Sequence, residues 1–108
     1  YTGTHDNVTT EGWRATASPE DVHYACRYLR CTPKDLTEAM IVVCLSCVSD
    51  MAIIPMADWL HLGAEARINT PSTQGSNWQW RLTTPLTSLL ADHIADLTTL
   101  YDRAPAAE

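Results

Sequence analysis

Tyr1-Thr2-Gly3-Thr4-His5-Asp6-Asn7 is the stretch of this sequence on which the fold prediction depends. Residues 1–5 are rich in threonine and tyrosine, which favours an extended segment. At its end, the side chains of His5, Asp6 and Asn7 can hydrogen-bond a polar ligand. A histidine and an aspartate at the carboxyl end of a strand lie where α/β enzymes place catalytic groups. We therefore expect the chain to be the tail of a larger enzyme and to carry one part of its active site.

A second strand is predicted for Met51-Ala52-Ile53-Ile54-Pro55, a short apolar run closed by proline that fits a buried parallel strand. Two helices are expected before it. Ser18-Pro19-Glu20-Asp21 combines a capping serine, a proline at the first helical position and two acids at the positive end of the helix dipole, which predicts a helix over 19–30. Thr32-Pro33-Lys34-Asp35 repeats this signal. The helix that follows, to about Ser49, is apolar on most sides and is expected to be largely buried.

The segments after the second strand are expected to be a short helical turn, a long loop and a final helix. Residues 56–62 predict the helical turn, which Gly63 stops. Residues 64–85 are rich in proline, glycine, asparagine, serine and threonine, and an ordered loop of that length in a compact domain is usually functional. Thr87 then caps an amphipathic helix that ends near Arg103.

Residues 7–17 are predicted to form a loop with Trp13 as its one large apolar anchor. The whole order is therefore strand, loop, two helices, strand, long loop and helix. This order describes two β/α units with polar loops after the strands, and it places the chain in the α/β class. An incomplete parallel arrangement explains why both strands and the second helix look buried.

The composition of the chain sets limits on size and partners. Its 108 residues suffice for one domain with a core but not for a closed (β/α)8 barrel, which needs roughly 250 residues. Seven basic and 13 acidic residues give a net charge of −6, so nucleic acid and anionic membranes are not expected partners. No apolar run reaches the length of a membrane span. The four tryptophans and four tyrosines suit sugar rings, but they also suit ordinary cores.

The four cysteines permit two interpretations. Cys26-x4-Cys31 and Cys44-x-x-Cys47 superficially resemble zinc-ligand spacings. Cys44 and Cys47 nevertheless fall inside an apolar helix, where free cysteine behaves as a small hydrophobic residue. We therefore expect core thiols in a reducing compartment rather than metal ligands, and we expect no metal and no cofactor.

Several motifs resemble those of the 4-α-glucanotransferases, also called amylomaltases or disproportionating enzymes, of glycoside hydrolase family 77. They occur in the family's order over nearly the whole chain. These motifs are Tyr1 to Asn7 with Thr9-Thr10 and Gly12-Trp13, then Ser49 to Asp58, Gly63 to Pro71, Asn77 to Leu82, and Leu97-Thr98-x-Leu100-Tyr101-x-Arg103. Some positions depart from the pattern, among them Val8, where an acid is usual, and Ser72 and Ser76, where glycines are usual.

The resemblance implies a fold, a reaction and site residues. Residues 1–108 would be the carboxy-terminal part of a (β/α)8 barrel (TIM barrel) catalytic domain and would supply its last two β/α units. The family transfers α-1,4-glucan segments between malto-oligosaccharides with retention, using an aspartate nucleophile, a glutamate acid/base and a third aspartate that stabilises the transition state. Only the third maps onto this chain, at Asp6, and His5 is expected to bind sugar hydroxyls. The implied partners are malto-oligosaccharides and the remainder of the barrel. The implied location is cytoplasmic, or plastidic in a plant or alga.

Each candidate site residue also has a structural alternative. By spacing alone, His5 and Asp6 could be a loop pair that caps the next turn, and only the resemblance favours catalytic support. Asn69, expected to bind substrate, could instead form an Asx-turn before Pro71.

Other polar and aromatic residues in the motifs are assigned structural roles. Trp78 and Trp80 would share one face of an extended segment, and packing against the barrel is favoured over a sugar platform. A structural ion pair is favoured for Glu65 and Arg67 over a ligand clamp. Asp50 and Asp58 are expected to cap helices or to support the site through hydrogen bonds. A non-catalytic carbohydrate-binding or interaction module, and a small zinc protein, are the alternatives to the enzyme.

Overall fold

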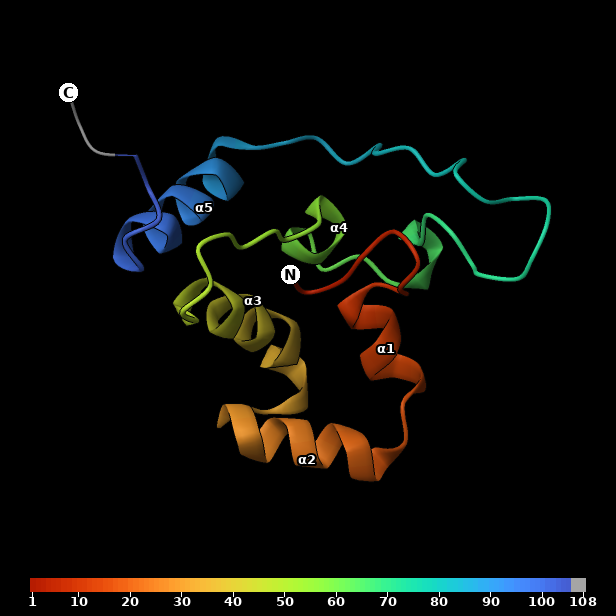
Figure 1. Ribbon diagram of the computed structural model, residues 1–108, viewed down its shortest axis with the longest axis horizontal. Coiled ribbons are helices and arrows are strands. Elements are labelled where there is room, and N and C mark those ends of the chain that lie inside the picture. The colour runs from red at the N-terminus through yellow and green to blue at the C-terminus, as the bar shows by residue number, and fades with distance from the viewer. Residues whose placement is uncertain (106–108) are drawn as a thin grey trace.

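Five α-helices and two short 3-10 helices are joined by extended segments and loops in residues 1–105, the part of the chain that the computed structural model describes. The body measures 48 × 33 × 25 Å, with α2 at one side and the long loop before α5 along the opposite edge (Figure 1). No helix in the described part combines the length and the apolar character needed to cross a bilayer. The elements are α1 (Thr10–Thr16), α2 (Pro19–Leu29), η1 (Pro33–Asp35), α3 (Leu36–Ser46), α4 (Met56–Trp59), η2 (Ala64–Ala66) and α5 (Ser88–Leu100).

The helix starts predicted at Ser18 and Thr87 are confirmed, whereas the signal at Thr32-Pro33 begins the 3-10 turn η1 without a side-chain cap, and α3 starts at Leu36. The Ser18 hydroxyl accepts a hydrogen bond from the Asp21 N–H at 3.1 Å, and Pro19 begins α2. The Thr87 hydroxyl accepts from the Leu90 N–H at 3.2 Å and caps α5. Each cap satisfies a backbone donor that has no partner within its helix, which is why serine and threonine are reliable start signals.

The loop predicted for residues 7–17 is wrong, because Thr10–Thr16 form α1. The Thr9 hydroxyl caps this helix by accepting from the Gly12 N–H at 3.1 Å. A glycine inside a helix weakens it. The structure shows why glycine is needed: a Cβ at Gly12 would lie 2.6 Å from the Val8 side chain and 3.1 Å from the backbone nitrogen of Ala64.

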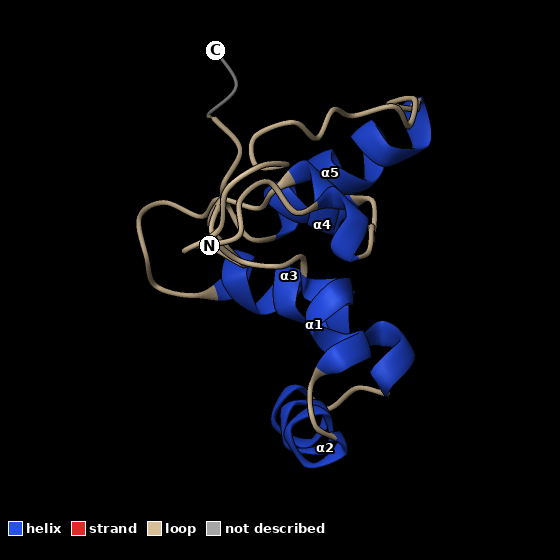
Figure 2. Cartoon of the chain, turned by 90° about the vertical axis from the view of Figure 1, so that its right-hand side faces the viewer, coloured by secondary structure: helices blue, strands red, loops and turns tan. Residues whose placement is uncertain are grey.

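The two predicted strands are not found, and the described residues contain helices and loops only (Figure 2). Residues 1–4 and 51–55 are nevertheless neighbours, since the Thr2 N–H donates to the Ile53 carbonyl at 3.4 Å. A parallel strand forms a regular ladder with a partner along its length. One long hydrogen bond is no ladder, so these apolar and threonine-rich segments run side by side without becoming a sheet. The prediction of an α/β fold with two strands is corrected to that extent.

The core lies between α3, α4 and α5. Ile41 and Leu45 of α3, Trp59 of α4 and Leu97 of α5 form its buried cluster. The second predicted helix is thus present, but it is less buried than expected, because Val43 is 46% exposed and the helix ends at Ser46. Part of the apolar surface of α3 is therefore not covered by the described residues.

Arg103, which follows α5, caps the carboxyl end of α3. Its Nε donates to the Leu45 carbonyl at 2.6 Å, and its Nη2 donates to the carbonyls of Cys47 and Ser49 at 3.0 and 2.9 Å. The last carbonyls of a helix have no partner within it, and a cation there complements the negative end of the helix dipole. The final helix, predicted to end near Arg103, ends at Leu100; α5 contributes a core face, and the segment that follows it contributes this cap.

Glu11 of α1 joins α1 to α3. One carboxylate oxygen accepts from the Arg14 guanidinium at 2.6 Å, and the other accepts from the buried Thr37 hydroxyl at 2.8 Å. Burial acts to raise the pKa of Glu11, but the hydrogen bonds from Arg14 and Thr37 and the Arg14 charge outweigh it and hold the pKa below its usual value.

A pH-dependent contribution of Glu11 to stability follows. Because its folded-state pKa is lowered, its stabilisation is present above the ordinary value of 4.5 and is lost as the pH falls through the folded-state value. We expect Glu11→Gln to lower the free energy of unfolding by about 1 kcal/mol at neutral pH and by much less at about pH 3. Urea unfolding followed by circular dichroism at both pH values measures this. An equal loss at both would show that the Glu11 charge does not matter.

Candidate functional site

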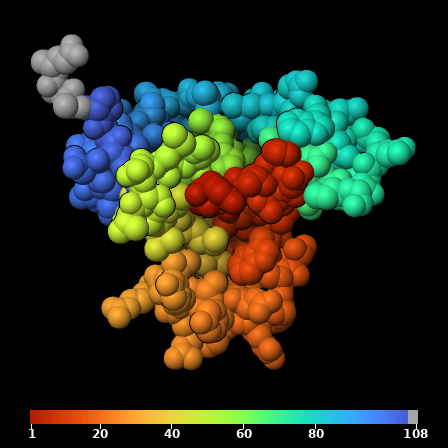
Figure 3. Space-filling model, viewed as in Figure 1, coloured from red at the N-terminus to blue at the C-terminus, as the bar shows by residue number. Residues whose placement is uncertain are grey.

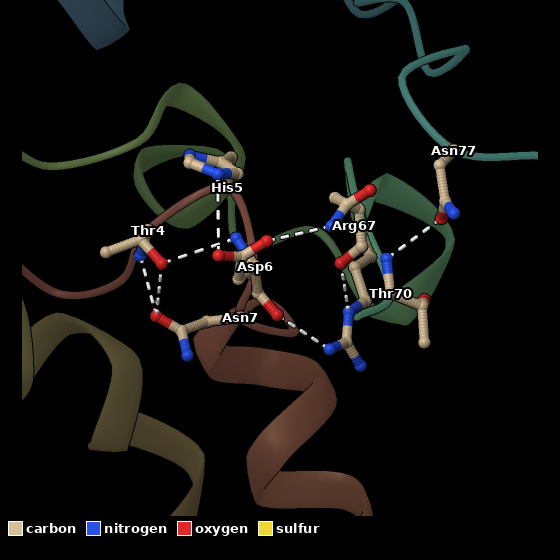
Figure 4. Close-up of polar contacts among 8 residues, drawn as sticks. Thr4, His5, Asp6, Asn7, Arg67, Thr70 and Asn77 are labelled. Carbon is tan, nitrogen blue, oxygen red and sulfur yellow. Dashed lines mark hydrogen bonds and ion pairs between the residues drawn. The ribbon is translucent and has the colours of Figure 1, made fainter. Parts of the chain in front are cut away.

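The three predicted site residues, His5, Asp6 and Asn69, lie together although 63 positions separate Asp6 from Asn69. The Asn69 side-chain Nδ2 donates to Asp6 Oδ1 at 2.8 Å, and the Asn69 N–H donates to the His5 carbonyl at 3.0 Å. The His5 Nε2 lies 3.4 Å from Asp6 Oδ2 (Figure 4). The His5 and Asp6 side chains are 52% and 48% exposed, so both reach solvent.

A tight turn at residues 4–7 presents these side chains. The Asn7 N–H donates to the Thr4 carbonyl at 3.1 Å, and Asn7 Oδ1 accepts from the Thr4 N–H and hydroxyl at 2.7 and 3.0 Å. Asn and Thr close such turns with their own short side chains. The turn is therefore closed by Thr4 and Asn7, while the Asp6 carboxylate points across to Asn69 instead of capping the turn.

Arg67 fixes the two chain segments of the site to each other. Its Nη2 donates to the Asp6 carbonyl at 2.7 Å and its Nε donates to the Asn69 carbonyl at 2.9 Å. The ion pair predicted with Glu65 is wrong, since Glu65 Oε1 accepts from the Gly63 N–H at 3.1 Å. Sequence reasoning favoured an ion pair for Arg67 over a ligand clamp and missed its contacts to main-chain carbonyls, because such contacts need no charged partner in the sequence. It is a positioning residue.

Trp78 lies against His5, with ring centroids 4.9 Å apart and a 38° angle between the ring planes. Its N–H donates to the Ile68 carbonyl at 2.7 Å, and its φ of 62° turns the chain. This turn interrupts the extended segment that was predicted for Trp78 and Trp80. The two side chains therefore do not share one face of such a segment. Trp78 is 56% exposed among the described residues, and its predicted packing against the rest of a barrel stays a prediction.

The loop between Asn69 and Trp78 is closed by a different asparagine. The Thr70 N–H donates to Asn77 Oδ1 at 2.9 Å (Figure 4). Asn77 Nδ2 donates to the Thr73 hydroxyl at 3.0 Å. The Asx-turn considered for Asn69 is thus not how its side chain is used. Asn77 holds the loop, which leaves the Asn69 amide directed at Asp6.

A pocket of about 430 Å³ opens beside this cluster. Its lining includes His5, Arg67 and Trp80 together with Tyr1 and Ile53. In the space-filling view the first residues cross the middle of the visible face, between the residues around 41–55 and the long loop (Figure 3). The site is therefore at the surface, where the first segment meets the loop.

Asp58 supports the site through buried hydrogen bonds. It is 2% exposed, and its carboxylate accepts from the Thr2 hydroxyl at 2.6 Å, from the Thr10 N–H at 2.9 Å and from the Thr10 hydroxyl at 3.0 Å. Asp58 thereby ties α4 to the segment that carries the turn and to the first residue of α1. The predicted role in hydrogen bonding is confirmed for Asp58, whereas Asp50 lies exposed.

The cysteines are only partly core residues. Cys26 and Cys44 are buried, Cys31 is half-buried and Cys47 is exposed at the end of α3, so the core assignment of Cys47 is wrong. Hydrogen bonds from Ser49, together with the nearby Arg103 charge, lower the pKa of the Cys47 thiol. Across residues 1–105, no three histidine, cysteine or acidic side chains form a group that could hold a metal ion.

The arrangement can bind a polar, multiply hydroxylated ring. It offers a carboxylate, an imidazole and an amide as hydrogen-bonding groups beside an exposed indole face. A family model described as 4-alpha-glucanotransferase (glycoside hydrolase family 77) matches residues 1–87, which include every residue of this cluster. The chain belongs to the 4-alpha-glucanotransferase family.

Individual members of the 4-alpha-glucanotransferase family match the chain almost from end to end. A chloroplastic/amyloplastic enzyme of Arabidopsis thaliana is 41% identical over 108 residues, which is 95% of this chain and 19% of the relative. An enzyme of Streptococcus pneumoniae is 44% identical over 106 residues, covering 95% of this chain and 21% of the relative. The chain thus spans about a fifth of the length of these relatives.

A solved amylomaltase from Streptococcus agalactiae, in complex with acarbose, has a similar structure. It superimposes with a TM-score of 0.90 and 36% sequence identity, covering 97% of this chain and 22% of the amylomaltase. The chain therefore has the fold of the corresponding part of an amylomaltase.

Proposed function

We propose that the chain is the carboxy-terminal part of a 4-α-glucanotransferase, which transfers α-1,4-glucan segments between malto-oligosaccharides by a retaining double displacement. The observation that carries this proposal is the position of Asp6: it lies in the family-matched segment, it is half exposed, and Asn69 holds its carboxylate. The name of the structural relative, an amylomaltase with bound acarbose, supports a glucan-like ligand.

Asp6 is proposed to stabilise the transition state. Retaining glycosyl transfer passes through an oxocarbenium-like state, in which hydrogen bonds to the sugar hydroxyl beside the anomeric carbon strengthen. A carboxylate fixed by Asn69 and facing solvent can accept that hydrogen bond. His5 is proposed to bind a neighbouring hydroxyl, and its orientation is set by Trp78 on one side and Asp6 on the other.

Asn69 is proposed as a second substrate-binding residue. Its Nδ2 donates one of its two hydrogens to Asp6. Its amide oxygen is a separate acceptor and can accept a hydrogen bond from a sugar hydroxyl. The nucleophile and the acid/base would belong to the other part of the barrel, which this chain needs as its partner. The four thiols are free, which agrees with a reducing compartment, and we infer cytoplasm or plastid.

A chimera tests the proposed function directly. The matching part of the Streptococcus agalactiae amylomaltase, 22% of that chain, would be replaced by these 108 residues. We expect the chimera to convert maltotriose into glucose and longer maltodextrins, because the two parts share the fold. The 108-residue chain alone should produce neither. A folded chimera without activity would favour a non-catalytic module, and activity of the separate chain would refute the proposed division of catalytic residues.

A further inference from the structure

The end of α2 brings two cysteines together in a helix-ending motif. Arg30 has φ 55° and ψ 49°, the left-handed conformation, and its N–H donates to the Arg27 carbonyl at 3.4 Å. The next N–H, that of Cys31, donates to the Cys26 carbonyl at 3.0 Å. These two bonds are those of a Schellman motif, in which the residue after the left-handed one contacts the residue five positions earlier. In this chain both contacting residues are cysteines.

The two thiols also affect each other. Burial and the neighbouring Cys26 thiol raise the pKa of Cys31. Both side chains line one shallow hollow of about 1050 Å³, which is open to solvent. Cys31 is half-buried and Cys26 is 7% exposed, so a small reagent reaches Cys31 first and finds Cys26 behind it.

We propose that Cys26 and Cys31 form a modification site that closes to an intrachain disulfide across the end of α2, with a low-molecular-weight disulfide as the oxidant. Cys31 loses its proton, its sulfur bonds one sulfur of the oxidant, and the other sulfur leaves as a thiolate. Cys26 then loses its proton and attacks the Cys31 sulfur, which expels the second oxidant sulfur. Two cysteines are oxidised, the oxidant is reduced to two thiols, and the two protons end on them.

The geometry favours closure over a stable mixed disulfide. A disulfide requires its two Cα atoms to lie roughly 4.4–6.8 Å apart, and the Schellman hydrogen bond already joins the backbones of these two residues. The site is separate from the cluster around Asp6, so the proposal does not depend on glucan transfer. The disulfide would fix the corner that leads from α2 into η1.

The test measures disulfide formation with glutathione disulfide in a Cys47→Ser background. Cys47 is removed because it is exposed and has a lowered pKa, so it would react first. After free thiols are alkylated, mass spectrometry identifies the pairs. We expect a Cys26–Cys31 disulfide as the main product, with a larger equilibrium constant in buffer than in guanidinium chloride. A glutathione adduct that persists on Cys31, or equal constants in both solvents, would overturn the proposal.

Variants of Arg30 test whether the Schellman motif, rather than a chance encounter, brings the two thiols together. Arg30→Gly adopts the left-handed conformation without cost, whereas Arg30→Val strongly resists it. We expect the equilibrium constant for closure to be at least about five-fold larger for the glycine variant than for the valine variant. Circular dichroism confirms that both retain their helices. Identical constants in two folded variants would show that the Schellman geometry does not bring the thiols together.

Discussion

Asp6→Asn in the active chimera should lower kcat for maltotriose by about 10²–10³-fold while changing KM much less. The asparagine keeps the shape of the side chain and can still accept from Asn69 through its amide oxygen. It lacks the negative charge that a developing oxocarbenium ion requires. Initial rates of glucose release over a range of maltotriose concentrations give both constants.

The matched control for this substitution is Asp96→Asn. Asp96 is an exposed aspartate on α5, an element that contributes nothing to the cluster of His5, Asp6 and Asn69. Its variant should keep the parent kcat, and thermal unfolding should show that both variants fold. If Asp6→Asn keeps a rate within a few-fold of the parent, Asp6 does not stabilise the transition state and the proposed function loses its main support.

The parts of the fold that sequence reasoning predicted correctly depend on contacts between near neighbours. Ser18 and Thr87 each cap a helix through a residue three positions later, and such a signal is complete in the local sequence. Asp6 and Asn69 were each named as a site residue from motifs of one family, but local sequence did not predict the hydrogen bond that joins them. Their roles in transfer are a proposal.

The errors concern interactions whose partners are remote. The helix α1 was missed, and the glycine within it, Gly12, is explained by the approach of the Ala64 backbone, which no local pattern reveals. Arg67 was assigned to the nearest acid, whereas it binds main-chain carbonyls that every residue has. The apolar run 51–55 was predicted to be a strand, but a strand needs a regular hydrogen-bond ladder with a neighbour, and the described residues supply a single long hydrogen bond from Thr2.

The largest stability effect is expected at Asp58. Asp58→Ala should destabilise the folded chimera by about 3 kcal/mol or more, a large share of the 5–15 kcal/mol that typically stabilises a domain. The alanine leaves the Thr10 N–H and two threonine hydroxyls without their acceptor in a site that is 2% exposed. Urea unfolding of the chimera measures the loss.

Asp58→Asn should cost about half as much, because an amide oxygen still accepts from the Thr10 N–H and the amide nitrogen can donate to a threonine hydroxyl. Thr2→Val completes a double-mutant cycle. It should destabilise the parent by about 1 kcal/mol and the Asp58→Ala variant hardly at all, since the donor it removes has already lost its acceptor. Additive losses would show that the two side chains do not depend on each other.

The same cycle connects stability with the site. Thr2 lies three residues before His5, and the Thr2–Asp58 hydrogen bond is the polar side-chain contact that anchors that segment to α4. We therefore expect Asp58→Ala to lower kcat even at temperatures where the chimera stays folded, because the segment that carries Asp6 then loses its side-chain anchor to α4 and depends mainly on its contacts to the long loop. Full activity of a folded Asp58→Ala chimera would mean that Arg67 and Asn69 suffice to position the carboxylate.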